Sequence, residues 1–194
     1  MVFSNGKLIY QVGNCTNKII GITGFGSSGK STLLKHVSKE LKIEQFSLED
    51  YQREKFAKYG SPINYHNRLG LNITYYGLWD EYLEQISKFN KGNSIIIDGI
   101  YTSRFIDMVA ERMGCGQSYI INVCAPTNFR IRLFSDKTGL NWLEAEKQLF
   151  QLDKIKMDVG IIGVIRRSNF ILNNNSEMKD FLRRGEDMVK SVLN

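Results

Sequence analysis

A glycine-rich segment near the start of the chain has the residue types of a phosphate-binding loop. Residues 24–32 read GFGSSGKST, which fits the pattern Gly-x4-Gly-Lys-[Ser/Thr]. Glycines let the main chain approach phosphate oxygens, and successive N–H groups of such a loop form a concavity that binds anions. Lys30 is expected to reach the β- and γ-phosphates of a nucleotide, and the hydroxyl of Ser31 to bind Mg²⁺. The residues expected to hold the other phosphate oxygens are Gly24, Gly26, Ser27, Ser28, Gly29 and Thr32.

The segments on either side of this loop support the interpretation. Residues 18–23 (KIIGIT) form an apolar run typical of a strand that is buried on both faces of a parallel sheet. Residues 30–42 carry apolar side chains at helical spacing, which predicts a helix with one buried face. The positive N-terminal end of that helix would point at a bound phosphate. The alternative, a chance glycine-rich turn, would not require this strand–loop–helix context.

An aspartate ends the next strongly apolar segment. Residues 94–98 (SIIID) predict a second buried strand, with Asp98 at its carboxyl end. Next to a phosphate-binding loop, an acid at this place is expected to orient hydrated Mg²⁺ through water. Many strands end in an Asp-Gly turn without such a role, so the assignment depends on the loop. Arg104, on a helix predicted over residues 103–113, is expected within reach of a bound phosphate.

A third candidate segment follows a strand predicted over residues 43–47. Asp50 and Arg53 come just after the carboxyl end of this strand, where open α/β sheets bind their ligands. An equally good interpretation places Asp50 at the positive end of a helix and Arg53 in solvent. The spacing alone leaves both interpretations open.

Several basic residues follow in the second half of the chain. One predicted helix carries Arg130 and Arg132, and a second helix is expected to begin at the N-cap residue Asn141. These basic side chains either form a solvated helix face or belong to a mobile lid over about residues 130–150. Such a lid would close positive charge over the transferring phosphate.

The remaining segments are expected to form the scaffold. Residues 59–70 read as a loop because glycine and proline interrupt them, and His66 within it is expected at the surface. Residues 72–90 carry aromatic and aliphatic side chains at helical spacing, which indicates a core-facing stripe rather than a base-stacking surface. Further strands are predicted over residues 118–124 and 169–172.

Composition limits the class of protein. The chain of 194 residues is 42% apolar and 24% charged, which is typical of a globular protein, and we expect residues 1–194 to form a single domain. No apolar run reaches the length of a transmembrane helix, and no secretory signal is recognisable. Three widely spaced cysteines fit reduced thiols and a cytoplasmic location. The net charge of +6 fits an anionic partner, but scattered basic residues favour a local phosphate site over nucleic acid.

Strands and helices alternate along the chain, which predicts an α/β fold with a parallel sheet covered on both faces. Several segments then resemble the nucleoside monophosphate kinase-like family of P-loop proteins. Residues 47–53 (SLEDYQR) are similar to the adenylate kinase segment Ser-Thr-Gly-Asp-Leu-Leu-Arg, and residues 97–100 (IDGI) to the family's Asp-Gly segment. Residues 158–165 (DVGIIGVI) and 168–174 (SNFILNN) resemble dephospho-CoA kinases, and most of all their archaeal, adenylate kinase-related relatives.

The resemblance implies a three-layer P-loop NTPase fold with five parallel strands in the order 2-3-1-4-5 and a small lid. It implies that Arg53, within an acceptor-binding region of about residues 47–90, holds the phosphate of the acceptor. Asp50 and Arg104 are expected to face the same acceptor. The resemblance also implies that the asparagines after the last strand contribute to the adenine pocket, and these are Asn173 and Asn174.

The chain departs from these families at three places. It lacks the Asp-Ala-Asp segment and the His-Pro segment of dephospho-CoA kinases, which makes dephospho-CoA a second choice of acceptor. Family lids carry an arginine shortly after an Arg-Leu pair, whereas Arg132 and Leu133 are followed by Lys137. A lysine can supply a point charge there but not a bidentate fork. Arg132 and Lys137 are expected to act with Lys30 and Asp98 in catalysis.

Together these features predict an ATP- and Mg²⁺-dependent kinase that transfers the γ-phosphoryl group to a small nucleotide, a nucleoside or deoxynucleoside monophosphate. Dephospho-CoA or a nucleoside is the second choice of acceptor. Two other classes remain, namely a nucleotide-gated binding protein whose altered lid has lost transfer activity and a kinase acting on nucleic-acid ends. The last would need a continuous basic groove with exposed aromatics, whereas most aromatics here fall on core-facing stripes.

Overall fold

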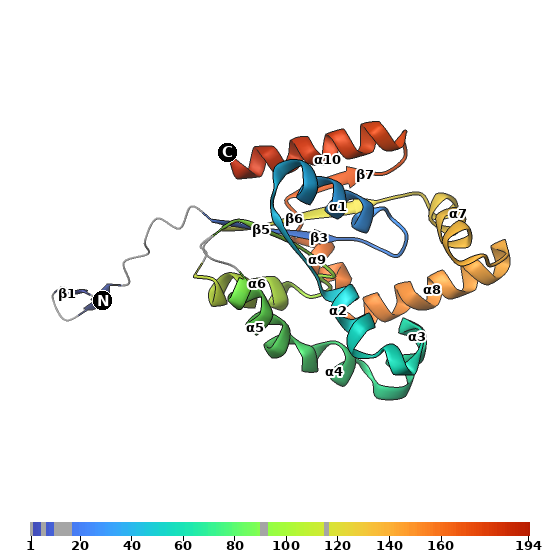
Figure 1. Cartoon of the computed structure of the whole chain (residues 1–194), viewed down its shortest axis with the longest axis horizontal. Coiled ribbons are helices and arrows are strands. Elements are labelled where there is room, and N and C mark those ends of the chain that lie inside the picture. The colour runs from blue at the N-terminus through green and yellow to red at the C-terminus, as the bar shows by residue number, and fades with distance from the viewer. Residues whose placement is uncertain (1, 5–6, 10–16, 90–92, 115–116) are drawn as a thin grey trace.

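A parallel sheet of five strands forms the centre of the protein (Figure 1). The computed structural model describes residues 2–4, 7–9, 17–89, 93–114 and 117–194. The sheet has the strand order β4-β5-β3-β6-β7, and all four neighbouring pairs are parallel. Counted from β3 as the first strand, this is the predicted order 2-3-1-4-5, which is confirmed. Its strands are β3 (Lys18–Thr23), β4 (Glu44–Ser47), β5 (Ile95–Asp98), β6 (Gln117–Cys124) and β7 (Phe170–Asn173).

Helices cover both faces of this sheet, as a three-layer α/β fold requires (Figure 1). On one face lie α1 (Lys30–Leu41) and α10 (Met178–Leu193). On the other face lie α5 (Trp79–Phe89), α6 (Ser103–Arg112) and α9 (Ile161–Arg166). A separate antiparallel pair is formed by β1 (Val2–Ser4) and β2 (Lys7–Ile9).

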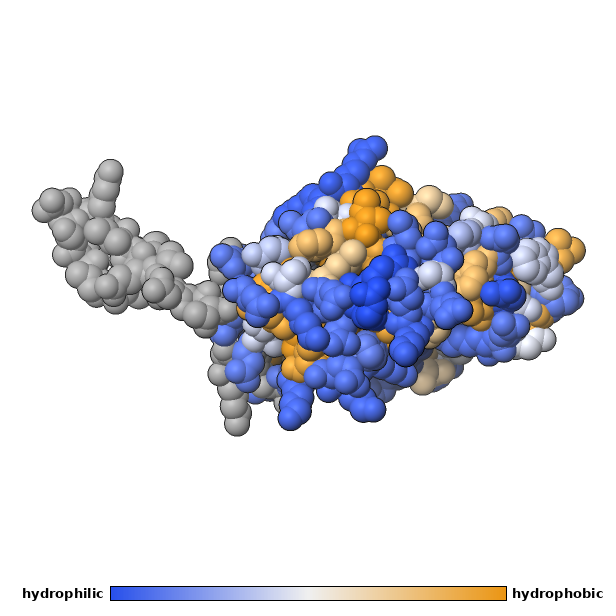
Figure 2. Space-filling view, turned by 90° about the horizontal axis from the view of Figure 1, so that it is seen from above, coloured by the Kyte–Doolittle hydropathy of each residue, from blue (hydrophilic) through white to orange (hydrophobic). Residues whose placement is uncertain are grey.

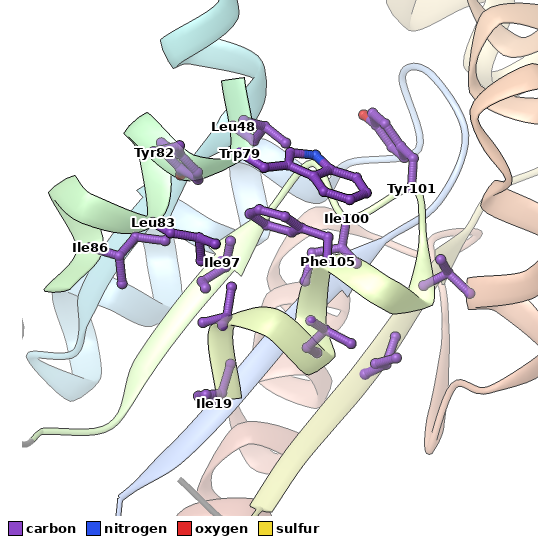
Figure 3. Packing of buried hydrophobic residues seen from close by; sticks show 14 of the residues in the cluster. Ile19, Leu48, Trp79, Tyr82, Leu83, Ile86, Ile97, Ile100, Tyr101 and Phe105 are labelled. Atoms are coloured by element: carbon purple, nitrogen blue, oxygen red, sulfur yellow. The ribbon is translucent and has the colours of Figure 1, made fainter. Parts of the chain in front are cut away.

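The central strands divide their side chains between two hydrophobic clusters. Ile20 of β3 packs in the cluster under α1 and α10, whereas its neighbour Ile19 packs in the cluster under α5 and α6, because successive strand residues point to opposite faces. Figure 3 shows the second cluster, in which the rings of Trp79 and Phe105 pack with centroids 5.6 Å apart. The helical stripe predicted over residues 72–90 therefore faces the core, as expected.

The surface is largely hydrophilic when the protein is seen from the side of α10, with hydrophobic patches scattered over it (Figure 2). None of the helices in the described part of the chain has both the length and the apolar character needed to cross a lipid bilayer.

Two predictions on the segment after β4 are wrong. Residues 59–70 contain a helix, α3 (Pro62–Leu69), whose N-cap Ser61 accepts a hydrogen bond from the N–H of Asn64. The predicted continuous helix over residues 72–90 is instead α4 (Leu71–Thr74), a 3-10 turn (Tyr76–Leu78) and α5. The break falls at Tyr75, whose hydroxyl donates to the carbonyl of Gly99 and accepts from the N–H of Tyr101.

The predicted lid corresponds to a helical hairpin. It consists of α7 (Thr127–Thr138) and α8 (Trp142–Val159), which Figure 1 shows extending from the edge of the sheet. Gly139 ends α7 with φ of 72°, a left-handed conformation that suits glycine. Asn141 caps α8, as predicted, by accepting from the N–H of Glu144. The far end of α8 returns to the sheet, where α9 follows it.

Candidate active site

The glycine-rich segment forms a tightly supported loop between β3 and α1. Gly24 and Gly29 have φ values of 137° and 102°, which side-chain-bearing residues rarely adopt. A Cβ atom on Gly24 would lie 2.3 Å from the carbonyl oxygen of Val123 in the neighbouring strand. At the end of β3, the hydroxyl of Thr23 donates to the carbonyl of Ile100 at 2.8 Å. The loop therefore has the shape of a phosphate cradle, and the two glycines are required by space as well as by conformation.

Asn174 supports this loop from outside the cleft. Its side-chain amide donates to the carbonyl of Ser28 at 3.0 Å, and its own N–H donates to Cys124. Asn173 is exposed, and its carbonyl accepts from Arg184. Neither asparagine lines the cleft described below, and their expected contact with adenine stays a prediction. Their place in this structure is behind the loop.

Lys30 begins α1 and is buried inside the loop. Its Nζ donates to the carbonyl of Phe25 at 2.9 Å, and the residue is only 5% exposed. Burial lowers the pKa of Lys30 to about 7, with a further lowering from the nearby ammonium of Lys156. Burial and a like charge both oppose the protonated form of Lys30. A bound polyanion would offset them and stabilise that protonated form. The loop also holds the buried hydroxyl of Ser28, which has no hydrogen-bond partner among the described residues.

Asp98 ends β5 directly beside the ends of two other strands. It is paired in register with Ile22 of β3 and with Ser47 of β4. The carboxyl is almost fully buried, and its Oδ1 has no hydrogen-bond partner among the described residues. Burial, and then the carboxylate of Glu49, raise the pKa of Asp98 to about 7. The side chain of Ser47 bonds the carboxyl and favours its ionised form, while the free Oδ1 fits a hydrated cation.

Few side chains of the described residues could hold Mg²⁺. In the described ranges no group of three or more histidine, cysteine or acidic side chains is placed to hold a metal ion. Mg²⁺ typically keeps several waters and shares its protein ligands with substrate phosphates. Ser31 and Asp98 fit this kind of site, because a nucleotide would supply the other oxygens.

The loop opens into a cleft of about 290 Å³. Residues 26–32 form one wall, and the other walls come from α3, α7, α8 and α2 (Leu48–Lys55). Arg53 of α2 lines the cleft and binds Asp50 Oδ1 at 3.0 Å and Glu49 Oε2 at 3.5 Å. Its side chain is half exposed, so it is available to a ligand.

Two of the predicted acceptor residues lie elsewhere. Asp50 is exposed and does not line the cleft, although it binds the guanidinium of Arg53. The expectation that Arg104 shares the cleft with Arg53 and Lys30 is wrong, because Arg104 is exposed on the first turn of α6 and is not part of the lining. The acceptor side of the cleft consequently has one predicted arginine instead of two.

Aromatic side chains line the same side of the cleft. Tyr65, Tyr75 and Tyr101 belong to this wall, together with His66, whose Nδ1 lies 2.6 Å from the hydroxyl of Thr74. Burial lowers the pKa of His66 to about 4, so the imidazole is neutral near pH 7. The prediction that His66 is a surface residue is wrong, because α3 turns it towards the cleft. This wall is aromatic, and its three tyrosines are almost fully buried, at 1–4% exposure.

The hairpin contributes one predicted lid residue to the cleft and turns the other away. Lys137 lines the cleft. Arg132 is exposed outside it, with its guanidinium 5.2 Å from the ring centroid of Phe129 on the same helix. Arg132 therefore does not line the cleft in this structure, and its expected part in catalysis stays a prediction.

Arg130, two residues earlier, is buried and pairs with Asp153 of α8. Asp153 in turn accepts from the N–H of Gly26 in the phosphate loop at 2.9 Å. A Cβ on Gly26 would lie 2.8 Å from Leu149 Cδ1, which shows how closely α8 approaches the loop. The hairpin is thereby linked to the main chain of the glycine-rich loop.

Two residues of the site, Glu49 and Asp153, escaped the sequence analysis, and Lys156 was not distinguished from the other basic residues of the second half of the chain. Lys156 Nζ donates to Glu49 Oε1 at 2.9 Å and lies 4.7 Å from the ring centroid of Tyr101. Burial alone would raise the pKa of Glu49, but Lys156 and Lys30 together hold it at about 2. A signal was present, because Leu149, Asp153 and Lys156 recur at helical spacing and form the buried face of α8.

Sequence comparisons find relatives that match over nearly the whole length of the chain. No protein-family model matches the chain. A "UPF0200 protein" of Sulfurisphaera tokodaii is 28% identical over 180 residues, which cover 91% of this chain and 98% of that one. A UPF0200 protein of Methanococcus maripaludis is 22% identical over 184 residues, again covering 91% and 98%.

Solved structures of kinases superpose on most of the chain. The shikimate kinase of Acinetobacter baumannii matches with a TM-score of 0.55 and 14% identity, covering 91% of this chain and 93% of that one. A gluconokinase of Sinorhizobium meliloti matches with a TM-score of 0.56 and 12% identity, covering 92% and 94%. The chain therefore shares its three-layer α/β fold with these kinases.

Proposed function

We propose that this protein is an ATP- and Mg²⁺-dependent kinase that transfers the γ-phosphoryl group to a nucleoside or deoxynucleoside monophosphate. The observation that carries the proposal is the convergence at one cleft of the glycine cradle, the buried Lys30 and the half-exposed Arg53, with Asp98 close enough to Lys30 to act on its charge. Phosphoryl transfer needs little covalent chemistry from a protein and depends on positioning and on neutralising charge. These groups supply both.

Each part of the cleft has a distinct task in this proposal. The N–H groups of the loop and Lys30 hold the donor phosphates, while Ser31 and, through water, Asp98 hold Mg²⁺. The bound Mg²⁺ neutralises charge on the phosphate oxygens. Arg53 grips the acceptor phosphate with its planar fork. The wall that contains Tyr65 stacks against the base of the acceptor.

A hydroxyl acceptor, such as a nucleoside or dephospho-CoA, is the second candidate. One observation favours it, because Glu49 is ionised and lines the cleft. A carboxylate at this place can accept the proton of an attacking hydroxyl. A monophosphate acceptor needs no such base, and the arginine beside Glu49 suits a phosphate, so we retain the monophosphate as the first choice.

A thermal-shift panel tests the proposal. A ligand that binds only the native state stabilises it by about 2.7 kcal/mol when its concentration is 100 times its dissociation constant. We expect ATP or ADP with Mg²⁺ to raise the melting temperature, and one or more monophosphates to raise it further in the presence of ADP. If no nucleotide stabilises the protein, the proposal is wrong.

Arg53→Lys should weaken binding of the acceptor and leave binding of ATP unchanged. Lysine keeps the charge but loses the fork, and one charged hydrogen bond is worth about 1.5–3 kcal/mol. We therefore expect the KM of the acceptor to rise roughly tenfold or more, with ATP affinity nearly unchanged, in steady-state kinetics. Arg68→Lys, at an exposed position of α3 outside the cleft lining, is the matched control. A loss of ATP affinity without a change for the acceptor would place Arg53 in the donor site or the scaffold.

Lys137→Met should lower turnover more than it weakens ATP binding, because a lid residue acts when the lid closes over the transferring phosphate. We expect a decrease in kcat of roughly tenfold, about one charged contact. Arg132→Met removes a charge from the opposite side of the same helix and is the control. Equal effects of the two changes on kcat would mean that general surface charge, rather than closure by Lys137, is responsible.

A further inference from the structure

Two ammonium groups meet at the floor of the cleft. Lys30 comes from the start of α1 and Lys156 from the inner face of α8, and both are buried, at 5% and 9% exposure. Both side chains line the same cleft, and they lie close enough to interact directly. Like charges brought together away from water repel each other strongly. Such a pair is stable only when negative charge is supplied nearby.

The protein itself supplies part of that charge. Glu49 accepts from Lys156 at 2.9 Å, and it also lies 3.5 Å from Arg53. Glu49 is the one acid among the described residues that line the cleft, and it faces Lys156 and Arg53; Asp50, which also binds Arg53, lies outside the lining. Lys30 and Lys137 line the same cleft and add positive charge. The cleft is short of negative charge, and a phosphoryl group would supply it.

We infer that Lys156 is a second phosphate-binding lysine, which contacts the transferring phosphoryl group opposite Lys30. Glu49 is its positioning residue, because the ion pair and the ring of Tyr101 fix the ammonium before any ligand binds. A charge that is already in place stabilises a transition state without reorganisation. The inference rests on the proposed function. It adds that Lys156 supplies the positive charge that a lid arginine would otherwise give.

A purely structural ion pair between α2 and α8 is the alternative, and a double variant separates the two. Lys156→Met alone would leave Glu49 buried with one cation fewer, which can destabilise the fold. Glu49→Gln together with Lys156→Met removes both charges at once. If the pair is only structural, the double variant should regain both stability and turnover. If Lys156 binds the phosphate, stability should return while turnover stays well below that of Glu49→Gln alone, the variant that accounts for any role of the carboxylate.

The experiment measures binding as well as turnover. Calorimetry with Mg²⁺ compares ADP with the non-hydrolysable β,γ-imido analogue of ATP in wild type, Lys156→Met, the double variant and Lys156→Arg. In both methionine variants, we expect the loss of affinity for the analogue to be at least tenfold larger than the loss of affinity for ADP. We expect kcat to fall by about 100-fold or more, which is the effect of removing one preorganised donor. Lys156→Arg, which keeps the charge, should recover part of the affinity. Lys154→Met, an exposed lysine of the same helix, is the control.

The outcomes are distinguishable. If wild type binds neither ADP nor the analogue, the proposed function and this inference both fail. If wild type binds the analogue and the double variant binds it equally well, only the role of Lys156 is wrong. A double variant with wild-type kcat would also overturn it.

Discussion

Lys30→Ala is expected to abolish phosphoryl transfer. Its Nζ lies inside the loop, where the residue is only 5% exposed and donates to the carbonyl of Phe25, and the proposed donor phosphates would bind there. Removal of one such preorganised donor costs on the order of 2–4 kcal/mol of transition-state stabilisation, which is about a 10²–10³-fold loss of kcat.

The fold should tolerate this change. Burial lowers the pKa of Lys30, which means that the folded chain disfavours its charged form. We therefore expect the melting temperature of the ligand-free protein to stay the same or rise. Lys35→Ala, at an exposed position of the same helix, should alter neither property. Wild-type turnover in a correctly folded Lys30→Ala protein would refute the donor-site assignment.

Asp98→Asn is expected to raise the Mg²⁺ concentration that transfer requires. An asparagine fills the same space at the end of β5 but lacks the charge that holds a hydrated cation. Loss of a group that orients a metal site typically costs 10–100-fold in affinity or activity. A Mg²⁺ titration of turnover measures the change, and excess Mg²⁺ should restore part of the activity.

Asp80→Asn, an exposed acid on α5, is the control for this substitution. It should leave the Mg²⁺ titration unchanged. If Asp98→Asn titrates as the wild type does, Asp98 belongs to the scaffold of the loop and not to a metal site.

Local sequence signals were sufficient for the fold where each element carried its own pattern. The apolar strand, the glycine loop and the amphipathic helix around Lys30 are contiguous, so their spacing determined the structure. The same kind of reasoning failed at α3, because Pro62 and its neighbouring glycines were taken as a loop, whereas proline suits the first turn of a helix. It also failed at Tyr75, whose hydroxyl bonds to the β5–α6 connection interrupt an otherwise helical pattern.

The site was harder to predict because it combines residues that are far apart in the chain. Glu49 and Lys156 are separated by 107 positions, and Gly26 and Asp153 by 127. The charge pattern of the sequence also did not show which arginine of α7 faces inward. Arg130 and Arg132 are two residues apart and so lie on nearly opposite sides of the helix. The packing of α8 against the loop places Arg130 inside and Arg132 in solvent.

The most direct test of the account is whether the protein moves phosphate from ATP to a small nucleotide. An assay that couples ADP release to an optical signal would be run with Mg²⁺ and ribonucleoside and deoxyribonucleoside monophosphates, with nucleosides and dephospho-CoA as competing acceptor classes. ³¹P NMR would identify the product. The account predicts ADP release that depends on a monophosphate and forms the matching diphosphate. Tight ATP binding without transfer to any acceptor in the panel would contradict it and favour a nucleotide-gated binding protein.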